Sequence, residues 1–255
     1  MVNLKDKLKN LEVSIGSWIT IGSSSIAEVM SRAGFEWLTV DMEHSVITLD
    51  KAQELIRAIE ACDVLPLVRV GENNANLIKR VMDAGAHGVI VPMVNTREDA
   101  LRAVAAVKYP PLGSRGVGLA RAQGYGFEFE KYKDWVNEKS LVIVQVEHIK
   151  AVDNLDKILN VEGVDAFIVG PYDLSGSIGK PGDFECREVK SALKNIIKIS
   201  KKMKKPAGFH VIQPQAGPLL NKIEEGYKLL SFSFDALFLG QICRDRMREI
   251  KKGSR

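Results

Sequence analysis

Several features that mark particular classes of protein are rare or missing in this 255-residue sequence. It has three cysteines, Cys62, Cys186 and Cys243, which are odd in number, far apart and without a CxxC pair. This pattern argues against a disulfide framework or a zinc ribbon and fits a reducing compartment. The opening residues, MVNLKDKLKN, lack the apolar core of a signal peptide, and no stretch is long enough to cross a bilayer. We therefore expect a cytoplasmic protein with no membrane partner.

Signatures of nucleotide and nucleic-acid binding are also missing. Gly179 and Lys180 precede a proline and lack the earlier glycine of a P-loop. The glycines between Gly113 and Gly118 follow a helical pattern and two prolines, whereas a dinucleotide fingerprint follows a strand. The 36 basic and 32 acidic residues leave a net charge of +4, and the basic excess is scattered along the chain. We therefore expect no nucleic-acid partner.

The sequence does contain a regular alternation of short apolar runs and amphipathic helical patterns. Eight runs have the continuity of strands that are buried on both faces, at 13–21, 35–40, 64–70, 88–91, 141–146, 166–170, 207–211 and 229–234. Eight such units favour a closed (β/α)8 TIM barrel over an open doubly wound sheet. The length and the 45% apolar composition suit a single domain over residues 1–255.

One long segment, residues 109–140, interrupts the alternation. It contains five glycines together with Arg115 and Arg121, and a helix is predicted only over its last part, 130–138. Such a segment inside a compact domain is typical of a lid, of a subunit contact or of disorder.

Two carboxylates follow neighbouring predicted strands. Glu147 comes directly after the run at 141–146, and Asp173 lies three residues past the run at 166–170. The carboxyl ends of parallel strands meet at one edge, so we expect the two acids to lie close together. A hard divalent cation such as Mg²⁺ or Mn²⁺ would relieve their repulsion, and two protein ligands leave positions open for substrate. The alternative is that each acid only caps the helix that follows it.

Other polar side chains are predicted at the same rim. Asp41 precedes His44 by three residues on one turn, which suits a carboxylate that orients an imidazole base, although His44 could also be a surface residue. Arg69, at the exit of its strand, suits the stabilisation of an enolate or a carboxylate, with a structural ion pair as the alternative.

Substrate contacts are expected from five further positions, and two histidines are less informative. The five positions are Trp18, Gln145, Gly170, Pro171 and Tyr172, of which the last two open a short helix whose amides can bind a carboxylate. His87 begins a strand and is therefore expected at the opposite, structural end of the barrel. His210 lies within or just past the strand at 207–211 and could face the site or pack below it.

Six segments, taken together, resemble those of the HpcH/HpaI aldolase family in order and in spacing: FEWLTVDMEHS, PLVRV, VIVPMVNTREDA, YPPLGSRGVG, VQVEHIKAVDNLDKIL and VEGVDAFIVGPYDLSGSIG. The likeness is to class II pyruvate aldolases, which act on 4-hydroxy-2-oxo acids such as 4-hydroxy-2-oxoheptanedioate and 2-keto-3-deoxy sugar acids. It implies a barrel assembled as a hexamer of swapped-helix dimers, with Mg²⁺, Mn²⁺ or Co²⁺ as cofactor. It also implies that Glu147 and Asp173 bind the metal and that Gln145 lies near it.

The resemblance further implies an acid–base dyad of His44 with Asp41 and an enolate-stabilising role for Arg69. The expected reaction is the reversible retro-aldol cleavage of a 4-hydroxy-2-oxo acid to pyruvate and an aldehyde. A Schiff-base aldolase is disfavoured, because it needs a lysine at a strand exit and Lys228 precedes its strand. The remaining alternatives are an acyl-CoA lyase of the citrate or malyl type and a non-catalytic barrel that binds a metal or an oxo acid.

The sequence departs from the family pattern in three places. Tyr172 stands in GPYDLS where a small residue is expected, and His148 stands where threonine is expected. The stretch HVIQPQ, which begins at His210, has no clear counterpart. These departures bear on which aldehyde the protein uses more than on which reaction it catalyses.

Overall fold

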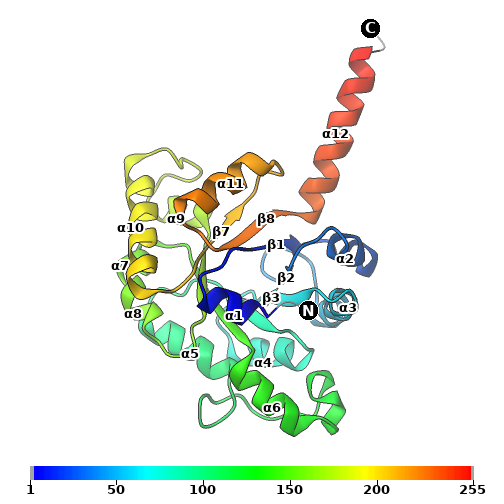
Figure 1. Ribbon diagram of the computed structural model, residues 1–255, viewed down its shortest axis with the longest axis vertical. Helices are drawn as coiled ribbons and strands as arrows, with labels where there is room; N and C mark the ends of the chain where they lie inside the picture. The colour runs from blue at the N-terminus through cyan, green and yellow to red at the C-terminus, as the bar shows by residue number, and fades with distance from the viewer. Residues whose placement is uncertain (1–2, 254–255) are drawn as a thin grey trace.

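A computed structural model describes residues 3–253 and shows eight parallel strands closed into a barrel (Figure 1). Each strand pairs with the next along the chain, and the last pairs with the first. The predicted (β/α)8 barrel is therefore confirmed, and the predicted strands agree with the observed ones to within two residues at each end. The strands are β1 (Ser14–Ile19), β2 (Trp37–Asp41), β3 (Leu65–Arg69), β4 (Gly88–Val91), β5 (Leu141–Val146), β6 (Ala166–Val169), β7 (Ala207–Val211) and β8 (Leu229–Phe234).

Helices surround the barrel and alternate with the strands. The β5–β6 connection is split into two short helices, and the irregular segment holds a 3-10 helix before its α-helix. The helices are α1 (Leu4–Lys9), α2 (Ser24–Ser31), α3 (Leu49–Glu60), α4 (Ala75–Asp83), α5 (Arg97–Val107), η1 (Arg121–Gly126), α6 (Phe129–Glu138), α7 (Ile149–Asp153), α8 (Leu155–Leu159), α9 (Pro171–Ser177), α10 (Arg187–Met203), α11 (Ala216–Glu225) and α12 (Asp235–Gly253).

Local sequence signals account for several helix ends. Thr96 and Asp99 form a reciprocal capping box at the start of α5, which satisfies backbone N–H groups that the helix leaves unpaired. The Asn74 side chain accepts hydrogen bonds from two backbone N–H groups of α4. Gly226 ends α11 at a φ of 111°, a conformation that glycine adopts without steric cost.

The barrel separates two layers of apolar packing. The larger cluster fills the space between the strands and the outer helices, and a smaller one fills the barrel interior, where α1 closes the lower end with Leu4 and Leu8. Trp37 is fully buried there, and a Cβ atom at Gly16 would lie 2.1 Å from its ring. Only glycine at position 16 therefore leaves room for the indole, and the packed interior confines any ligand site to the ends of the barrel.

The irregular segment is ordered around one buried arginine. The guanidinium of Arg115 pairs with Asp83 at 2.5 Å and lies 4.8 Å from the ring centroid of Tyr109 and 5.5 Å from that of Tyr132. Arg121 donates to the backbone carbonyl of Ala84 at 3.1 Å. These contacts tie the segment to the carboxyl end of α4, at the end of the barrel opposite the strand exits. The segment therefore cannot close over those exits as a lid.

The final helix leaves the barrel. In Figure 1, α12 projects away from the remaining helices. Near its start Phe238 packs on Phe35 and Phe232, with ring centroids 6.3 Å and 5.2 Å apart. Further along, Leu239, Ile242, Met247 and Ile250 are about half exposed or more. Within residues 3–253 no helix is both long and apolar enough to pass through a membrane.

Candidate active site at the carboxyl ends of the strands

A cavity of about 420 Å³ opens at the carboxyl ends of the barrel strands. Nine of the ten side chains and glycines predicted for the site lie in its lining: Trp18, Asp41, His44, Arg69, Gln145, Gly170, Pro171, Tyr172 and Asp173. The tenth, Glu147, lies behind Gly170, because a Cβ atom on this glycine would come within 3.0 Å of Glu147 Oε2. The parallel barrel thus brings residues from five strands and their exits to one place.

Asp41 and Arg69 form a bidentate ion pair at the carboxyl ends of β2 and β3. Arg69 Nε donates to Asp41 Oδ1 at 2.9 Å, and Arg69 Nη2 donates to Asp41 Oδ2 at 2.7 Å. Burial alone would raise the pKa of Asp41, but the Arg69 hydrogen bonds and charge outweigh it, so the pKa of this carboxyl is lowered. Asp41 is therefore ionised, and it fixes the plane of the guanidinium.

His44 is held near this pair by its backbone. Its N–H donates to Asp41 Oδ1 at 3.3 Å, whereas its imidazole Nε2 lies 3.8 Å from Glu43 Oε2. The His44 side chain is 65% exposed, so the ring faces the solvent-filled cavity. Both oxygens of the Asp41 carboxylate accept hydrogen bonds from Arg69. The acid that lies nearest to the His44 imidazole in the described chain is Glu43.

Glu43 belongs to the site although the sequence interpretation gave it no role. Its Oε2 lies 3.2 Å from Arg69 Nη1, and the same atom is buried without a hydrogen bond among residues 3–253. Burial, followed by the charges of Glu147, Asp41 and Asp173, raises the pKa of Glu43 to about 7, although the charge of Arg69 opposes this shift. The one sequence signal for Glu43 is its position in VDMEHS, between Asp41 and His44, which are both predicted site residues.

Glu147 is fixed by two donors from neighbouring strands. The backbone N–H of Met93, just past β4, donates to Oε1 at 2.7 Å, and Gln145 Nε2 donates to Oε2. Burial raises the pKa of Glu147, and the negative charge of Asp173 adds to this effect against both donors. Gln145 thus acts on the cavity partly through Glu147, which it orients.

Asp173 stands exposed in the first turn of α9, at the exit of β6. Its charge acts on both Glu43 and Glu147, which places the three acids within electrostatic reach of one another. With Asp41, four carboxyl groups lie at this rim, where Arg69 pairs with Asp41 and Glu43, and no lysine lies in the described lining of the cavity. This surplus of negative charge, together with a Glu43 oxygen that accepts no hydrogen bond in the described chain, fits a divalent cation held by Glu147 and Asp173.

The described chain offers no cluster of three or more histidine, cysteine or acidic side chains placed to hold a metal ion. A cation at this rim would therefore have two protein ligands and several positions for water or substrate. Such an open site suits catalysis better than structural metal binding.

Trp18 and His210 form an aromatic part of the cavity wall, beside Arg69. The guanidinium carbon of Arg69 lies 4.3 Å from the centroid of the Trp18 ring, and the rings of Trp18 and His210 are 5.2 Å apart. Burial lowers the pKa of His210 to about 4, so the ring is neutral. Its Nε2 lies 3.2 Å from the carbonyl oxygen of Ser233. The position of His210, left open by the sequence, is therefore at the site.

His87 lies away from this site, at the opposite end of the barrel. Its Nε2 is 3.2 Å from Glu60 Oε1, and its ring meets that of Trp135 edge-on at 5.0 Å. These contacts join α3, the start of β4 and α6, which is a packing arrangement.

Comparisons with known proteins identify the family of this chain. A sequence model of the HpcH/HpaI aldolase/citrate lyase family matches residues 14–236. The chain is similar to a 2-keto-3-deoxy-L-rhamnonate aldolase of Escherichia coli, with 35% identity over 251 residues that cover 98% of this chain and 93% of that protein.

Solved structures agree as well. An HpcH/HpaI aldolase/citrate lyase family protein from Burkholderia cenocepacia has a TM-score of 0.93 and 33% identity over 98% of this chain and 100% of its own. A citrate synthase has a TM-score of 0.86 and 26% identity over 99% of both chains. By the extent of these matches, the chain belongs to the HpcH/HpaI aldolase/citrate lyase family.

Proposed function

We propose that the protein is a divalent-metal-dependent aldolase that reversibly cleaves 4-hydroxy-2-oxo acids into pyruvate and an aldehyde, in the cytoplasm. The observation that carries the proposal is the surplus of carboxylates, Glu43, Glu147 and Asp173, at the rim that also holds one arginine oriented by Asp41. A rim of this kind suits a 2-oxo acid that chelates a cation and develops negative charge as its carbon–carbon bond breaks.

Glu147 and Asp173 would hold the cation, which is Mg²⁺, Mn²⁺ or Co²⁺ in this proposal. When bound, it supplies Lewis acidity toward the keto and carboxylate oxygens of the substrate. Gln145 keeps Glu147 in place through the hydrogen bond to Oε2. Gly170 leaves the space beside that oxygen free, because any larger residue would fill it.

Arg69 and His44 would manage charge and protons during cleavage. The imidazole of His44 accepts the proton of the C4 hydroxyl, the C3–C4 bond breaks, and the electron pair of that bond forms the pyruvate enolate as the aldehyde leaves. Return of the proton to C3 then gives pyruvate and regenerates the neutral imidazole. Arg69 stabilises the enolate oxygen with its positive charge. Asp41 contributes by orienting Arg69 and by holding the backbone of the turn that carries His44.

An acyl-CoA lyase of the citrate or malyl type is the second candidate. It is supported by the family's inclusion of citrate lyases and by the similarity to a citrate synthase structure. Both reactions need an enolate and a cation, so the product distinguishes them. An acyl-CoA lyase releases a CoA thioester, whereas the aldolase releases pyruvate. A non-catalytic barrel is less favoured, because His44 and Arg69 both lie in the cavity.

We also propose that the chain forms homo-oligomers, as a hexamer of swapped-helix dimers. Support comes from the apolar side chains that α12 exposes, such as Ile242 and Met247. Phe127 and Leu119 in the irregular segment, which are 95% and 63% exposed, are also well suited to a subunit contact.

The direct test measures pyruvate release from a panel of 4-hydroxy-2-oxo acids in an assay coupled to lactate dehydrogenase. We expect chelation with EDTA to abolish turnover and added Mg²⁺, Mn²⁺ or Co²⁺ to restore it, while borohydride traps no substrate on the protein. Full activity after exhaustive chelation would contradict the proposal, as would covalent trapping.

A further inference from the structure

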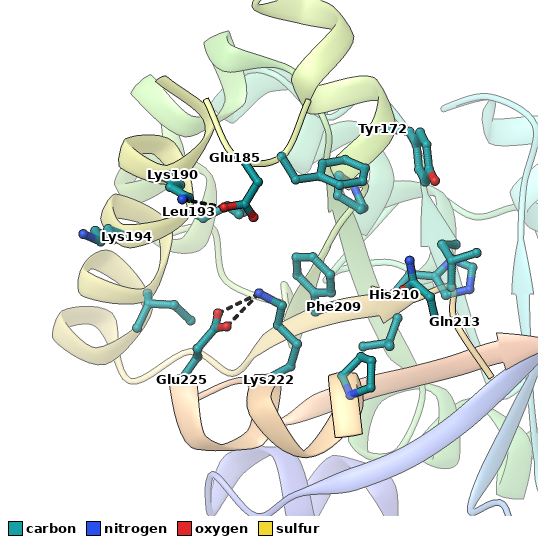
Figure 2. A pocket seen from close by; sticks show the side chains of 16 residues that line it. Tyr172, Glu185, Lys190, Leu193, Lys194, Phe209, His210, Gln213, Lys222 and Glu225 are labelled. Atoms are coloured by element: carbon teal, nitrogen blue, oxygen red, sulfur yellow. Dashed lines mark hydrogen bonds and ion pairs between the residues drawn. The ribbon is translucent and has the colours of Figure 1, made fainter. Parts of the chain in front are cut away.

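A second, larger cavity borders the candidate active site. Its volume is about 660 Å³, and it lies between α10, α11 and the carboxyl end of β7 (Figure 2). Four residues line both cavities, namely Pro171 and Tyr172 of α9, His210 of β7, and Ile212 just past it. The two spaces therefore meet between the start of α9 and the end of β7, directly beside the residues assigned to catalysis.

The walls of this second cavity are mainly apolar. Leu193 and Ile197 of α10 line one side, and Pro218 of α11 lines the other. Phe209 projects into the cavity (Figure 2), and its ring lies 5.0 Å from that of Tyr227. Since such walls offer few hydrogen-bond partners, they favour an occupant without hydroxyl or phosphate groups.

Two of the three lysines that line the second cavity are paired with carboxylates. Lys190 Nζ lies 2.6 Å from Glu185 Oε2, and Lys222 Nζ lies 2.8 Å from Glu225 Oε2 (Figure 2). The remaining lysine, Lys194, points away from the cavity in the same view. Each of these two lysines thus already has a carboxylate beside it, so a neutral occupant fits the apolar walls better than an anionic one.

Two aromatic side chains stand where the cavities meet. Tyr172 packs edge-on against Phe184, with ring centroids 5.0 Å apart, and is half exposed. His210 stands across from it, and its Nε2 must donate to the Ser233 carbonyl, because a carbonyl oxygen only accepts. Its Nδ1 is then a hydrogen-bond acceptor. Both residues fall in segments, GPYDLS and HVIQPQ, where this sequence departs from the family pattern.

We propose that the second cavity receives the carbon chain of the aldehyde half of the substrate, and that this chain is apolar, either aliphatic or aryl. The inference rests on the proposed aldolase function and adds the substrate class. The oxo-acid half lies over Glu147 and Asp173, and the bond to be broken lies near His44. The chain beyond C4 then passes between Tyr172 and His210 toward Phe209.

The test is aldol addition of pyruvate to unbranched aldehydes from propanal to hexanal, with lactaldehyde as a small hydroxylated comparison. We expect kcat/KM to rise roughly threefold for each added methylene, because each one leaves water for an apolar wall. Leu193→Trp, which fills the cavity, should raise KM for hexanal about tenfold, with less than about a twofold effect for lactaldehyde. Leu220→Trp, on the exposed side of α11, is the matched control and should change neither.

The outcomes separate this inference from the proposed function. Exchange of the methyl protons of pyruvate with solvent deuterium, followed by NMR, reports enolate formation without any aldehyde. Its absence in the wild-type protein with metal would contradict the proposed function itself. If exchange occurs but wild-type kcat/KM does not increase with chain length, the second-cavity proposal is wrong. It is also wrong if Leu193→Trp and a second filling variant, Ile197→Trp, affect hexanal and lactaldehyde equally.

Discussion

The two ends of the barrel carry opposite surpluses of charge. At the strand exits, the carboxyl groups of Asp41, Glu43, Glu147 and Asp173 lie at one rim, and Arg69 pairs with the first two. At the other end, three lysines, Lys5, Lys108 and Lys205, share the single nearby carboxylate of Asp165 in the described chain. The comparison is informative because like charges are crowded at both ends, while only one end is expected to bind a ligand.

At the lower end, the lysines are satisfied by neutral groups of the protein itself. Lys108 Nζ donates to Ser140 Oγ at 2.7 Å and to the backbone carbonyl of Val136. Lys5 Nζ donates to the carbonyl of Ser140 at 3.0 Å and pairs with Asp165 at 3.1 Å. These ammonium groups are enclosed, so they have little capacity left for a ligand, and they hold α1 and α5 against the barrel.

At the rim, the carboxylates keep unused acceptor capacity. Glu43 Oε2 is buried without a hydrogen bond in the described chain, and Asp173 is exposed to the cavity. The surplus of charge is thus relieved by hydrogen bonds at one end and is left for a cation and substrate at the other. The extent to which the charged groups are hydrogen-bonded within the protein, more than the number of charges, distinguishes a structural cluster from a functional one.

The largest expected effect comes from removing one rim charge without changing its shape. Asp173→Asn should lower kcat/KM for pyruvate release by about a thousandfold, because a cation ligand is lost. Stability should stay unchanged or increase, since Asp173 repels Glu43 and Glu147. Steady-state kinetics and urea unfolding measure the two effects.

The matched control for this change is Asp156→Asn, which alters an exposed aspartate in the first turn of α8, away from the cavity lining. It should leave kcat/KM within about twofold of the wild type. Equal activity of the two variants would remove Asp173 from the mechanism.

The next effect concerns the stability of the metal-free protein. The pKa of Glu43 is raised from 4.5 to about 7 in the folded state. Between these two pH values the folded protein holds a proton on Glu43 that the unfolded chain has lost, so the free energy of unfolding falls as the pH rises. This loss of stability is absent below pH 4.5, the pKa of Glu43 in the unfolded chain, and is complete above about pH 7, its pKa in the folded protein. Glu43→Gln should therefore add about 3 kcal/mol to the free energy of unfolding near pH 8, and little near pH 4.

Urea unfolding in EDTA at both pH values measures this difference, with the exposed Glu72→Gln as control. Saturating Mg²⁺ should reduce the difference, because the cation offsets the negative rim. A stabilisation that is equal at both pH values would show that the effect does not arise from ionisation of Glu43.

The smallest effect on activity is expected from a substitution at the end of the barrel opposite the strand exits. Burial, followed by the charge of Lys5, lowers the pKa of Lys108 from 10.5 to about 8, so its charged form is penalised at neutral pH. The folded state regains this stability as pH rises from about 8 toward the unfolded pKa. Lys108→Met should remove that rise in urea unfolding while kcat/KM changes less than about twofold. A tenfold loss of activity would show that the two ends are coupled.

Much of the barrel was predictable because its signals are local. The continuous apolar run at β5 and the Thr96–Asp99 cap are legible in a few residues each, and parallel strands force their exits to one end. That rule alone placed Arg69 and Gln145 beside the same cavity. The expected pairing of the Asp41 carboxylate with the His44 imidazole could not be judged from sequence spacing. The structure instead pairs this carboxylate with the Arg69 guanidinium, which comes from the next strand.

The sequence by itself determined the order of the strands and which polar residues leave them, because hydrophobic periodicity and chain direction are properties of the chain alone. Only the tertiary structure decided that Glu43 is crowded to a pKa near 7 and that His210 faces the site. It also decided that a second cavity opens behind Tyr172. Burial and charge coupling depend on distances between segments far apart in the chain, and those distances exist only once the barrel has closed.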